Sequence, residues 1–399
     1  MPDNFLHPWT KKLEKSFVQQ ALEVTANPDI ISFSLGRPDQ SLLGLLNPNN
    51  IPSDILSPQN LQYSPPSYEL KKHIVKLMKE RGVDCKEEEI FLTSGAQQAM
   101  SLLTKVMTHE NDTILVDQLT YPGFIQVNQS LNTKLVPIPC DIRSGIILDE
   151  LEKLLNCNPQ PRFIYMIPEG HNPLGISLGE TQRIQLIKLA QKYQIPIVED
   201  DAYGLLTYET TVPPLKSYWK EGVFYIGSFS KVLAPSFRVG WIVTPKTTIE
   251  RFETLKEGTD INTSTFSQKL ILSILNDTDF DAHVMTLRES YKKKRNIMVN
   301  SLKKYIPELE FEIPQSGFFL WGTLPSTVNT TELFNVALRE EGISFLPGEA
   351  FLIGERADAK NSLRLSFAFC PIERIEEGVK RLAYALQKVN NAALQRMAV

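Results

Sequence analysis

Short apolar runs alternate with longer amphipathic stretches through the middle of the chain. The runs are rich in β-branched residues and predict strands at Ile90–Thr93, Thr113–Asp117, Lys134–Pro137, Arg162–Ile167, Pro196–Glu199, Val223–Gly227 and Val239–Thr244. The stretches between them have helical periodicity and predict helices at Gln97–Thr108, Gly123–Leu131, Leu148–Asn156 and Gly179–Tyr193. This alternation predicts an α/β fold, in which helices sandwich a mostly parallel seven-stranded sheet joined by right-handed crossovers.

The pattern changes after about residue 286. A long amphipathic stretch at Val284–Tyr305 predicts one extended helix. Short strands are then expected near Phe311, Phe318–Gly322, Ser344 and Leu363–Phe367, with helices at Thr331–Glu341 and Ile372–Asn390. The 399 residues are too many for one ordinary core. We therefore expect a large domain at 51–285, a smaller α+β domain at 286–399, and an N-terminal arm at 1–50 that joins the small domain in part.

Composition and charge exclude several classes of protein. The formal net charge is -4, which does not suit binding to a phosphate backbone, so no nucleic-acid partner is expected. The one basic run, Lys292–Arg295, is interpreted as the solvated face of a helix. No window approaches the roughly 18 apolar residues of a membrane span, and the first residues do not resemble a signal peptide.

Cysteine and histidine are scattered along the sequence. The four cysteines form no C-x-x-C pair and indicate free thiols in a reducing compartment, so a cytoplasmic protein is expected. The five histidines lack metal-ligand spacing with a third ligand, and no metal site is predicted.

Candidate chemistry collects after the strands, where ligands bind in an open α/β sheet. The small residues of Ser94–Gln97 follow the first strand and open a helix, so they form either an anion site or an ordinary helix cap. Tyr121 could stack on a planar ligand or be a turn aromatic. Asn172 lies in a long Pro/Gly loop that can also be only a turn.

The next strands end in charged and hydroxyl side chains. The strand ending at Glu199 runs into Asp200 and Asp201, and buried acids are costly unless paired, so a cationic partner is expected. Lys231 follows an apolar strand in a run of small polar residues, which indicates a partly buried lysine suited to Schiff-base chemistry. Together with Arg238, this set fits pyridoxal phosphate, which needs phosphate donors, an acid for its ring nitrogen and an amine for its aldehyde.

The segment from Gly227 to Pro235, GSFSKVLAP, followed by Arg238-Val239-Gly240, resembles the cofactor-lysine signature of class I/II aminotransferases of pyridoxal-phosphate fold type I. The resemblance spans about residues 30 to 382. It is nearest to the subgroup of 2-aminoadipate and kynurenine aminotransferases and MocR-like regulators, through Gln62-Tyr63-Ser64, Ser94–Gln98 and Glu199-Asp200-Asp201. It implies a pyridoxal-phosphate transferase that moves the amino group of an L-α-amino acid to a 2-oxo acid.

The resemblance also implies residue roles. Lys231 would carry the cofactor as a Schiff base and move the proton, and Asp200 would keep the pyridine nitrogen protonated. Tyr203 and Asn172 would hydrogen-bond the ring oxygen, and Tyr121 would stack on the ring. The phosphate would be held by Ser94, Gly95, Ala96, Gln97, Ser228, Ser230 and Arg238, and by Tyr63 across the interface of a homodimer. The substrate would contact Arg364 through its α-carboxylate, and Gly36, Arg37 and Asn172.

The sequence departs from the family pattern at three places, the first being Ser67, where the subgroup usually has Gly before Tyr68. His171 stands before Asn172, where the family often has Gln, and is either a packed loop histidine or an added acid/base or substrate contact. The segment Gly36–Leu42 only partly matches the family, and its Arg37 either binds a second carboxylate or lies on the surface. These departures leave open elimination, cyclisation or oxidation on the same fold. A MocR-like ligand sensor, the third alternative, would need an N-terminal winged helix for which the sequence leaves no room.

Overall fold

The computed structural model describes residues 5–13, 15–17, 19, 27–43, 51–156 and 160–397. Its central feature is a seven-stranded sheet with the order β2-β10-β9-β8-β7-β3-β4. β10 is antiparallel to both of its neighbours, and the other pairs are parallel, as predicted. The strands are β2 Ile90–Thr93, β3 Thr113–Asp117, β4 Lys134–Ile138, β7 Phe163–Met166, β8 Ile197–Asp200, β9 Val223–Ser228 and β10 Gly240–Val243.

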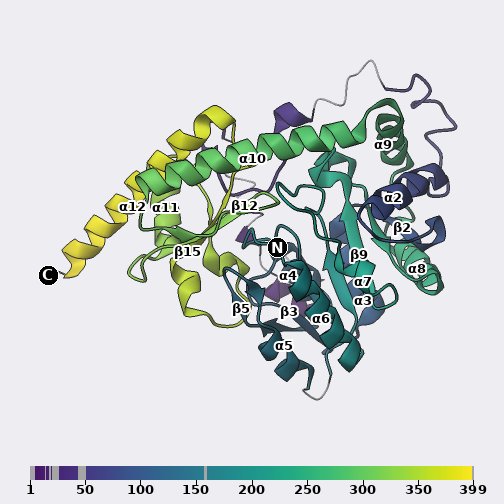
Figure 1. Ribbon diagram of the computed structural model, residues 1–399, viewed down its shortest axis with the longest axis horizontal. Coiled ribbons are helices and arrows are strands. Elements are labelled where there is room, and N and C mark those ends of the chain that lie inside the picture. Colours follow the sequence, from purple (N-terminus) through teal and green to yellow (C-terminus); the bar gives the residue numbers. More distant parts are fainter. Residues whose placement is uncertain are drawn as a thin grey trace.

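Helices cover both faces of this sheet (Figure 1). Both faces of the sheet carry apolar side chains that need covering. Along β3, Ile114 and Val116 pack into one buried cluster, whereas Leu115 between them packs into another. Strands buried on both faces appear in sequence as short continuous apolar runs. The helices are α2 Tyr68–Glu80, α3 Ala96–Met107, α4 Pro122–Gln129, α5 Leu148–Leu155, α6 Glu180–Tyr193, α7 Leu215–Tyr218, α8 Ile249–Asp260 and α9 Thr265–Asp277. Helices α2, α7, α8 and α9 were not predicted.

The C-terminal part forms a second layered unit beside the first. Its antiparallel sheet has the order β11-β12-β15-β14, with β11 Glu310–Phe311, β12 Phe319–Thr323, β15 Ser362–Ser366 and β14 Leu346–Pro347. Its helices are α10 Phe280–Tyr305, α11 Thr330–Glu340 and α12 Ile375–Met397. The N-terminal β1, Ile31–Ser32, pairs in parallel with β13, Ile343–Ser344. The domain limits at 50 and 285 stay predictions, since α10 runs along both units without a break (Figure 1).

The basic run on α10 corrects one prediction. Lys293 is exposed, but the side chains of Lys294 and Arg295 are only 2% and 7% exposed. Helical periodicity turns positions 291, 294, 295 and 298 toward the interior, where Arg295 donates to the carbonyl of Pro314 at 2.7 Å. The run is therefore only partly a solvated face. The sequence does not tell which side of this helix other elements cover, so the burial of Lys294 and Arg295 could not be predicted.

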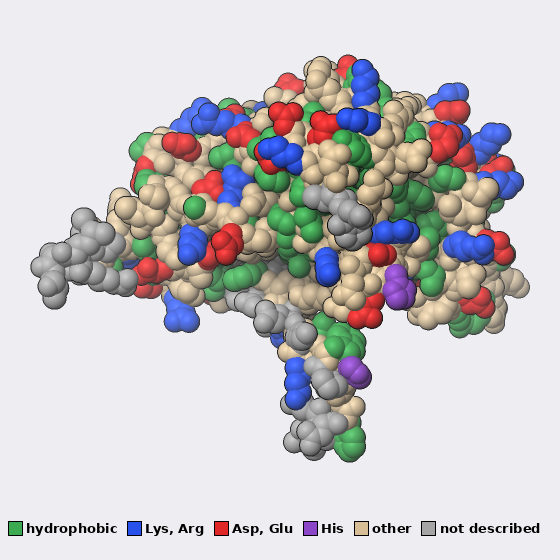
Figure 2. Space-filling view, turned by 90° about the horizontal axis from the view of Figure 1, so that it is seen from below, with side chains coloured by type: hydrophobic (Ala, Val, Ile, Leu, Met, Phe, Trp, Pro, Cys, Tyr) green, Lys and Arg blue, Asp and Glu red, His purple; other side chains and the backbone are tan. Residues whose placement is uncertain are grey.

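The described cysteines are free thiols, as predicted, and charges of both signs share the surface (Figure 2). Acidic and basic side chains are interspersed over the face in Figure 2. Cys85, Cys140 and Cys370 are buried free thiols, and Cys157 lies outside the described residues. Within the described part of the chain, no helix is long and apolar enough to cross a membrane. In the same residues, no group of three or more His, Cys, Asp or Glu is placed to hold a metal ion.

Candidate active site

A cavity of about 360 Å³ lies where the sheet meets the C-terminal unit. It brings together most of the residues predicted from the sequence, namely Gly36, Arg37, Ala96, Gln97, Tyr121, Asn172, Asp200, Tyr203, Ser228, Ser230, Lys231, Arg238 and Arg364. Sequence reasoning missed five lining residues: Leu35, Met100, Ile167, Ala202 and Phe319. These have small or apolar side chains, and a position after a strand was the only signal that could have found Ile167 and Ala202.

Lys231 ends a short 3-10 turn, Phe229–Lys231, directly after β9. Its Nζ donates to the carbonyl of Gly36 at 2.6 Å and lies 5.7 Å from the centre of the Tyr203 ring. Burial, together with the positive charges of Arg364 and Arg238, lowers the pKa of Lys231 to about 8. A lysine with this pKa is neutral, and so nucleophilic, in a much larger fraction of molecules than an exposed lysine.

Asp200 ends β8 and faces the same cavity. One carboxylate oxygen accepts a hydrogen bond from the Tyr165 hydroxyl at 2.8 Å, and the other is buried without a hydrogen-bond partner among the described residues. Burial is the main cause that raises the pKa of Asp200 to about 6. A buried carboxylate oxygen of this kind is stabilised by a cationic N–H donor, which a protonated pyridine nitrogen supplies.

The carboxylates on either side of Asp200 have structural partners. Glu199 accepts the backbone N–H groups of Leu215 and Lys216 at 2.8 and 2.9 Å. Asp201 forms a buried ion pair with Arg81 at 2.8 Å, which confirms that this acidic run includes a paired acid.

An anion cradle forms at the start of α3. Gly95 is the N-cap with φ +81°, and a Cβ on it would lie 2.5 Å from the Arg238 guanidinium. That guanidinium donates to Ser230 Oγ at 3.3 Å and to the Ser94 carbonyl at 3.4 Å. Ser228 Oγ donates to Ser230 Oγ at 3.0 Å. First-turn N–H groups, two hydroxyls and a guanidinium thus converge, as a bound phosphate requires.

Three of the predicted phosphate ligands do not line the cavity. The Ser94 hydroxyl instead donates to Asp260 at 2.8 Å, and Gly95 acts through its backbone conformation. Tyr63 is 79% exposed and also lies outside the cavity lining of its own chain.

Arg364 projects from β15 into the cavity and is 2% exposed. It donates to Asn172 Oδ1 at 2.8 Å and to the carbonyl of Ser34, and its guanidinium lies 4.1 Å from the centre of the Phe319 ring. Its Nε has no hydrogen-bond partner among the described residues, and burial lowers the pKa of this guanidinium to about 10. A buried cation of this kind suits a carboxylate ligand.

Arg37 lines the cavity, and its guanidinium stacks 4.4 Å from the centre of the Phe369 ring. The backbone of Gly36 lies close to the Phe319 ring, since a Cβ at this position would be 2.5 Å from that ring. The Tyr121 ring lies close to the backbone of Gly123, where a Cβ would be 2.3 Å from it. Glycine at 36 and at 123 thus lets Phe319 and Tyr121 approach the backbone closely.

His171 is a packed loop residue, the first of the two alternatives. Its Nε2 lies 3.1 Å from an Asp117 carboxylate oxygen, and its Nδ1 accepts the N–H of Leu174 at 3.3 Å. The accepting Nδ1 places the proton of the neutral ring on Nε2, which then donates to Asp117. This contact joins the loop of Asn172 to Asp117 at the end of β3, and both side chains line a separate small cavity.

These observations test whether the residues fit pyridoxal phosphate. The partnerless oxygen of Asp200, the low-pKa amine of Lys231 and the cradle at Arg238 correspond to the ring nitrogen, the aldehyde and the phosphate of that cofactor. All three border one cavity, so the residues fit the group.

Comparison with known proteins agrees with this geometry. The family model of aminotransferase class I and II matches residues 51–382. The aromatic-amino-acid aminotransferase 1 of Thermococcus litoralis is 32% identical over 388 residues, which cover 94% of this chain and 92% of that one.

Two solved structures are similar over nearly their whole length. The α-aminoadipate aminotransferase of Thermus thermophilus, complexed with N-(5'-phosphopyridoxyl)-L-leucine, has a TM-score of 0.88 at 30% identity and covers 98% of this chain and 99% of that one. The kynurenine aminotransferase of Pyrococcus horikoshii has a TM-score of 0.86 at 29% identity and covers 97% and 98%. The chain belongs to the class I and II aminotransferases of fold type I, and is a pyridoxal-phosphate-dependent enzyme that transfers amino groups.

Proposed function

We propose that Lys231 binds pyridoxal phosphate covalently and moves the proton during transfer of an amino group from an L-α-amino acid to a 2-oxo acid. The observation that carries this proposal is the placement of Lys231 and Asp200 on one cavity, each with its pKa shifted toward the neutral form. The neutral amine of Lys231 would hold the cofactor through its aldehyde and, once displaced by the amine of the substrate, would be the base that accepts the proton from the substrate Cα.

The other residues hold and tune the cofactor. Pyridoxal phosphate, when bound, supplies an electron sink for the negative charge that develops at the substrate Cα. The Asp200 carboxylate holds the proton on the ring nitrogen, which strengthens that sink. Tyr203 and Asn172 donate to the ring oxygen, and Tyr121 covers one face of the ring. The phosphate lies in the cradle of Ser228, Ser230, Arg238 and the first N–H groups of α3.

The substrate is oriented by two arginines. Arg364 binds the α-carboxylate. Its guanidinium is held by a hydrogen bond to Asn172, and its Nε has no hydrogen-bond partner among the described residues. Arg37 binds a second carboxylate, because it places a further cation on the cavity wall beside Gly36. We therefore propose that a dicarboxylic 2-oxo acid is the amino acceptor.

A homodimer and a cytoplasmic location complete the proposal. Tyr63 is exposed together with Leu56, Leu61 and Tyr68, which gives the segment 51–68 an apolar surface suited to a second copy. In the dimer, Tyr63 reaches the phosphate in the partner's cavity. The buried free thiols support a reducing compartment.

The test is an absorbance spectrum of the cofactor before and after adding single amino acids without an acceptor. Conversion to the pyridoxamine form is expected with at least one L-amino acid, and a 2-oxo acid should then reverse it. Lys231→Ala should lose the covalent absorbance band and about 10²-fold to 10⁴-fold or more in rate. A wild-type protein that never forms pyridoxamine, or a band that survives in Lys231→Ala, would overturn the proposal.

A further inference from the structure

Lys294 on α10 carries its positive charge into the protein interior. The side chain is 2% exposed, and its Nζ donates to the carbonyls of Ala368 and Cys370 at 2.8 and 2.7 Å and to the carboxylate of Asp39. An ammonium has three donors, so all three are used here. A buried ammonium is stable only when it is paired and hydrogen-bonded. The three acceptors therefore have to stay in place around the Lys294 ammonium.

The acceptors of Lys294 belong to two segments, one of which borders the active cavity. Asp39 closely follows Gly36 and Arg37, which line that cavity. Ala368 and Cys370 flank Phe369, on whose ring the Arg37 guanidinium lies at 4.4 Å. The ammonium therefore joins the same two segments that the contact of Arg37 with Phe369 joins. We call Arg37, which lines the cavity, and Phe369, which supports it, the substrate wall.

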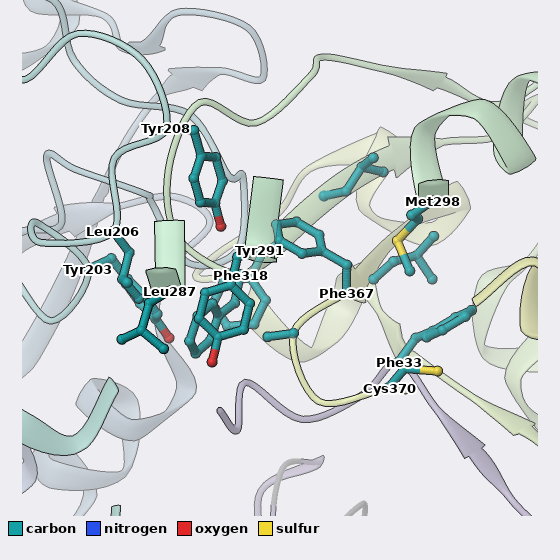
Figure 3. Close-up of a cluster of buried hydrophobic side chains, with 14 of the residues drawn as sticks. Phe33, Tyr203, Leu206, Tyr208, Leu287, Tyr291, Met298, Phe318, Phe367 and Cys370 are labelled. Carbon is teal, nitrogen blue, oxygen red and sulfur yellow. The ribbon is translucent and has the colours of Figure 1, made fainter. Parts of the chain in front are cut away.

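A second residue of α10 holds the first of these segments. The backbone N–H of Asp39 donates to the Tyr291 hydroxyl at 3.2 Å, one helical turn before Lys294. The Tyr291 ring packs on Phe318 with centres 4.7 Å apart (Figure 3). At the other end of the segment, the Gly36 carbonyl accepts from Lys231. The segment 36–39 is thus held between α10 and the catalytic lysine.

We propose that Lys294 is a positioning residue that sets the affinity for the substrate side chain by fixing the substrate wall, without touching the substrate itself. The inference rests on the proposed contact of the substrate with Arg37. Loss of the ammonium allows the two segments to separate, so Arg37 is no longer held in the position that binds the substrate. The phosphate cradle is built from other segments, at Ser228–Arg238 and the start of α3, and keeps its geometry.

The test compares Lys294→Met with Lys293→Met in the half-reaction of the pyridoxamine form of the holoenzyme with a dicarboxylic 2-oxo acid. Methionine keeps the length of the side chain and removes its charge, and Lys293 is the exposed neighbour in the same run. We expect the half-saturating concentration of the 2-oxo acid to rise about tenfold or more in Lys294→Met, as for a broken buried charge pair. The cofactor spectrum and the maximal rate should stay within about twofold of wild type, and Lys293→Met should match wild type. Asp39→Asn, which removes the opposite charge, serves where Lys294→Met fails to fold and should give the same split.

A double-mutant cycle separates positioning from a purely structural role. Arg37→Ala should raise half-saturation in wild type and have a smaller effect in the Lys294→Met or Asp39→Asn background, because the wall is already displaced. Additive effects, or a lower melting temperature with unchanged half-saturation, would overturn the inference. So would an Arg37→Ala variant with wild-type half-saturation, although the proposed amino transfer at Lys231 would then still stand. A wild-type enzyme without any half-reaction would instead overturn the proposed function.

Discussion

At the scale of single residues, the pKa of Lys231 gives a direct prediction for cofactor capture. Only the neutral amine attacks the aldehyde, so the rate at which apoenzyme captures pyridoxal phosphate should rise about tenfold per pH unit and level off above the pKa of about 8. An ordinary lysine would keep rising to about pH 10. Stopped-flow absorbance measures this rate. Arg364→Leu removes a positive charge that lowers this pKa, so its plateau should begin at higher pH, and an unchanged profile would contradict the assignment.

Asp200 predicts a pH-dependent stability in the apoprotein. Its pKa is raised from 3.8 to about 6 by burial, so the folded state holds this proton more tightly than the unfolded state. The stabilisation from the bound proton is complete below about pH 4 and is lost as the pH rises through about 6. The free energy of unfolding of Asp200→Asn relative to wild type should therefore rise by about 2 kcal/mol between about pH 4 and about pH 7. Urea unfolding at several pH values measures this difference, and a constant difference would contradict the predicted cost of the buried charge.

Several residues show what the sequence could and could not predict. Lys231, Asp200 and Asn172 follow strands whose apolar runs are readable, so their placement on one cavity could be predicted. Arg364 was identified only through the family resemblance, because a lone arginine in a strand of the second unit carries no local signal. Lys293 and Lys294 are chemically identical neighbours, and only tertiary packing makes one exposed and the other buried.

At the scale of elements, the start of α3 depends on the backbone of Gly95. Gly95→Ala introduces a Cβ 2.5 Å from the Arg238 guanidinium at a φ of +81°. We expect a loss of about 1–2 kcal/mol in unfolding free energy, from the left-handed conformation alone. The dissociation constant for pyridoxal phosphate should rise about tenfold or more, because the cradle opens. Urea unfolding and equilibrium dialysis measure the two effects.

Gly258 on α8 is the matched control for this substitution. A Cβ there meets nothing within 4 Å, so Gly258→Ala should stabilise the helix by about 0.5–1 kcal/mol and leave cofactor binding unchanged. Equal losses of cofactor affinity in both variants would contradict a specific role for Gly95. Helix α8 also shows why some elements escaped prediction. It buries only Phe252 and Lys256, so its apolar pattern is weak, whereas α3 buries Ala99, Met100, Leu102 and Leu103.

At the scale of the whole molecule, the exposed Tyr63 predicts that each cavity is completed by a second copy. Tyr63→Ala should weaken activity about 10-fold to 100-fold, the effect of losing a hydrogen bond to a charged phosphate. A hybrid dimer of one Lys231→Ala chain and one Tyr63→Ala chain then tests whether Tyr63 serves the cavity of its own chain or the cavity of its partner. If Tyr63 serves the partner's cavity, the Tyr63→Ala chain has an intact lysine and receives an intact tyrosine.

Such a hybrid should recover about half of the wild-type activity per dimer, because one of its two sites is complete. If Tyr63 served its own chain, both sites would be defective, and the hybrid would show about half the activity of the Tyr63→Ala dimer. Differently tagged chains, purified over two affinity steps, give the hybrid free of either parent. The measured rate then reports directly whether the tyrosine crosses the interface. The 79% exposure of Tyr63 and its place outside the cavity lining of its own chain both fit a role in the partner's cavity, which this hybrid tests.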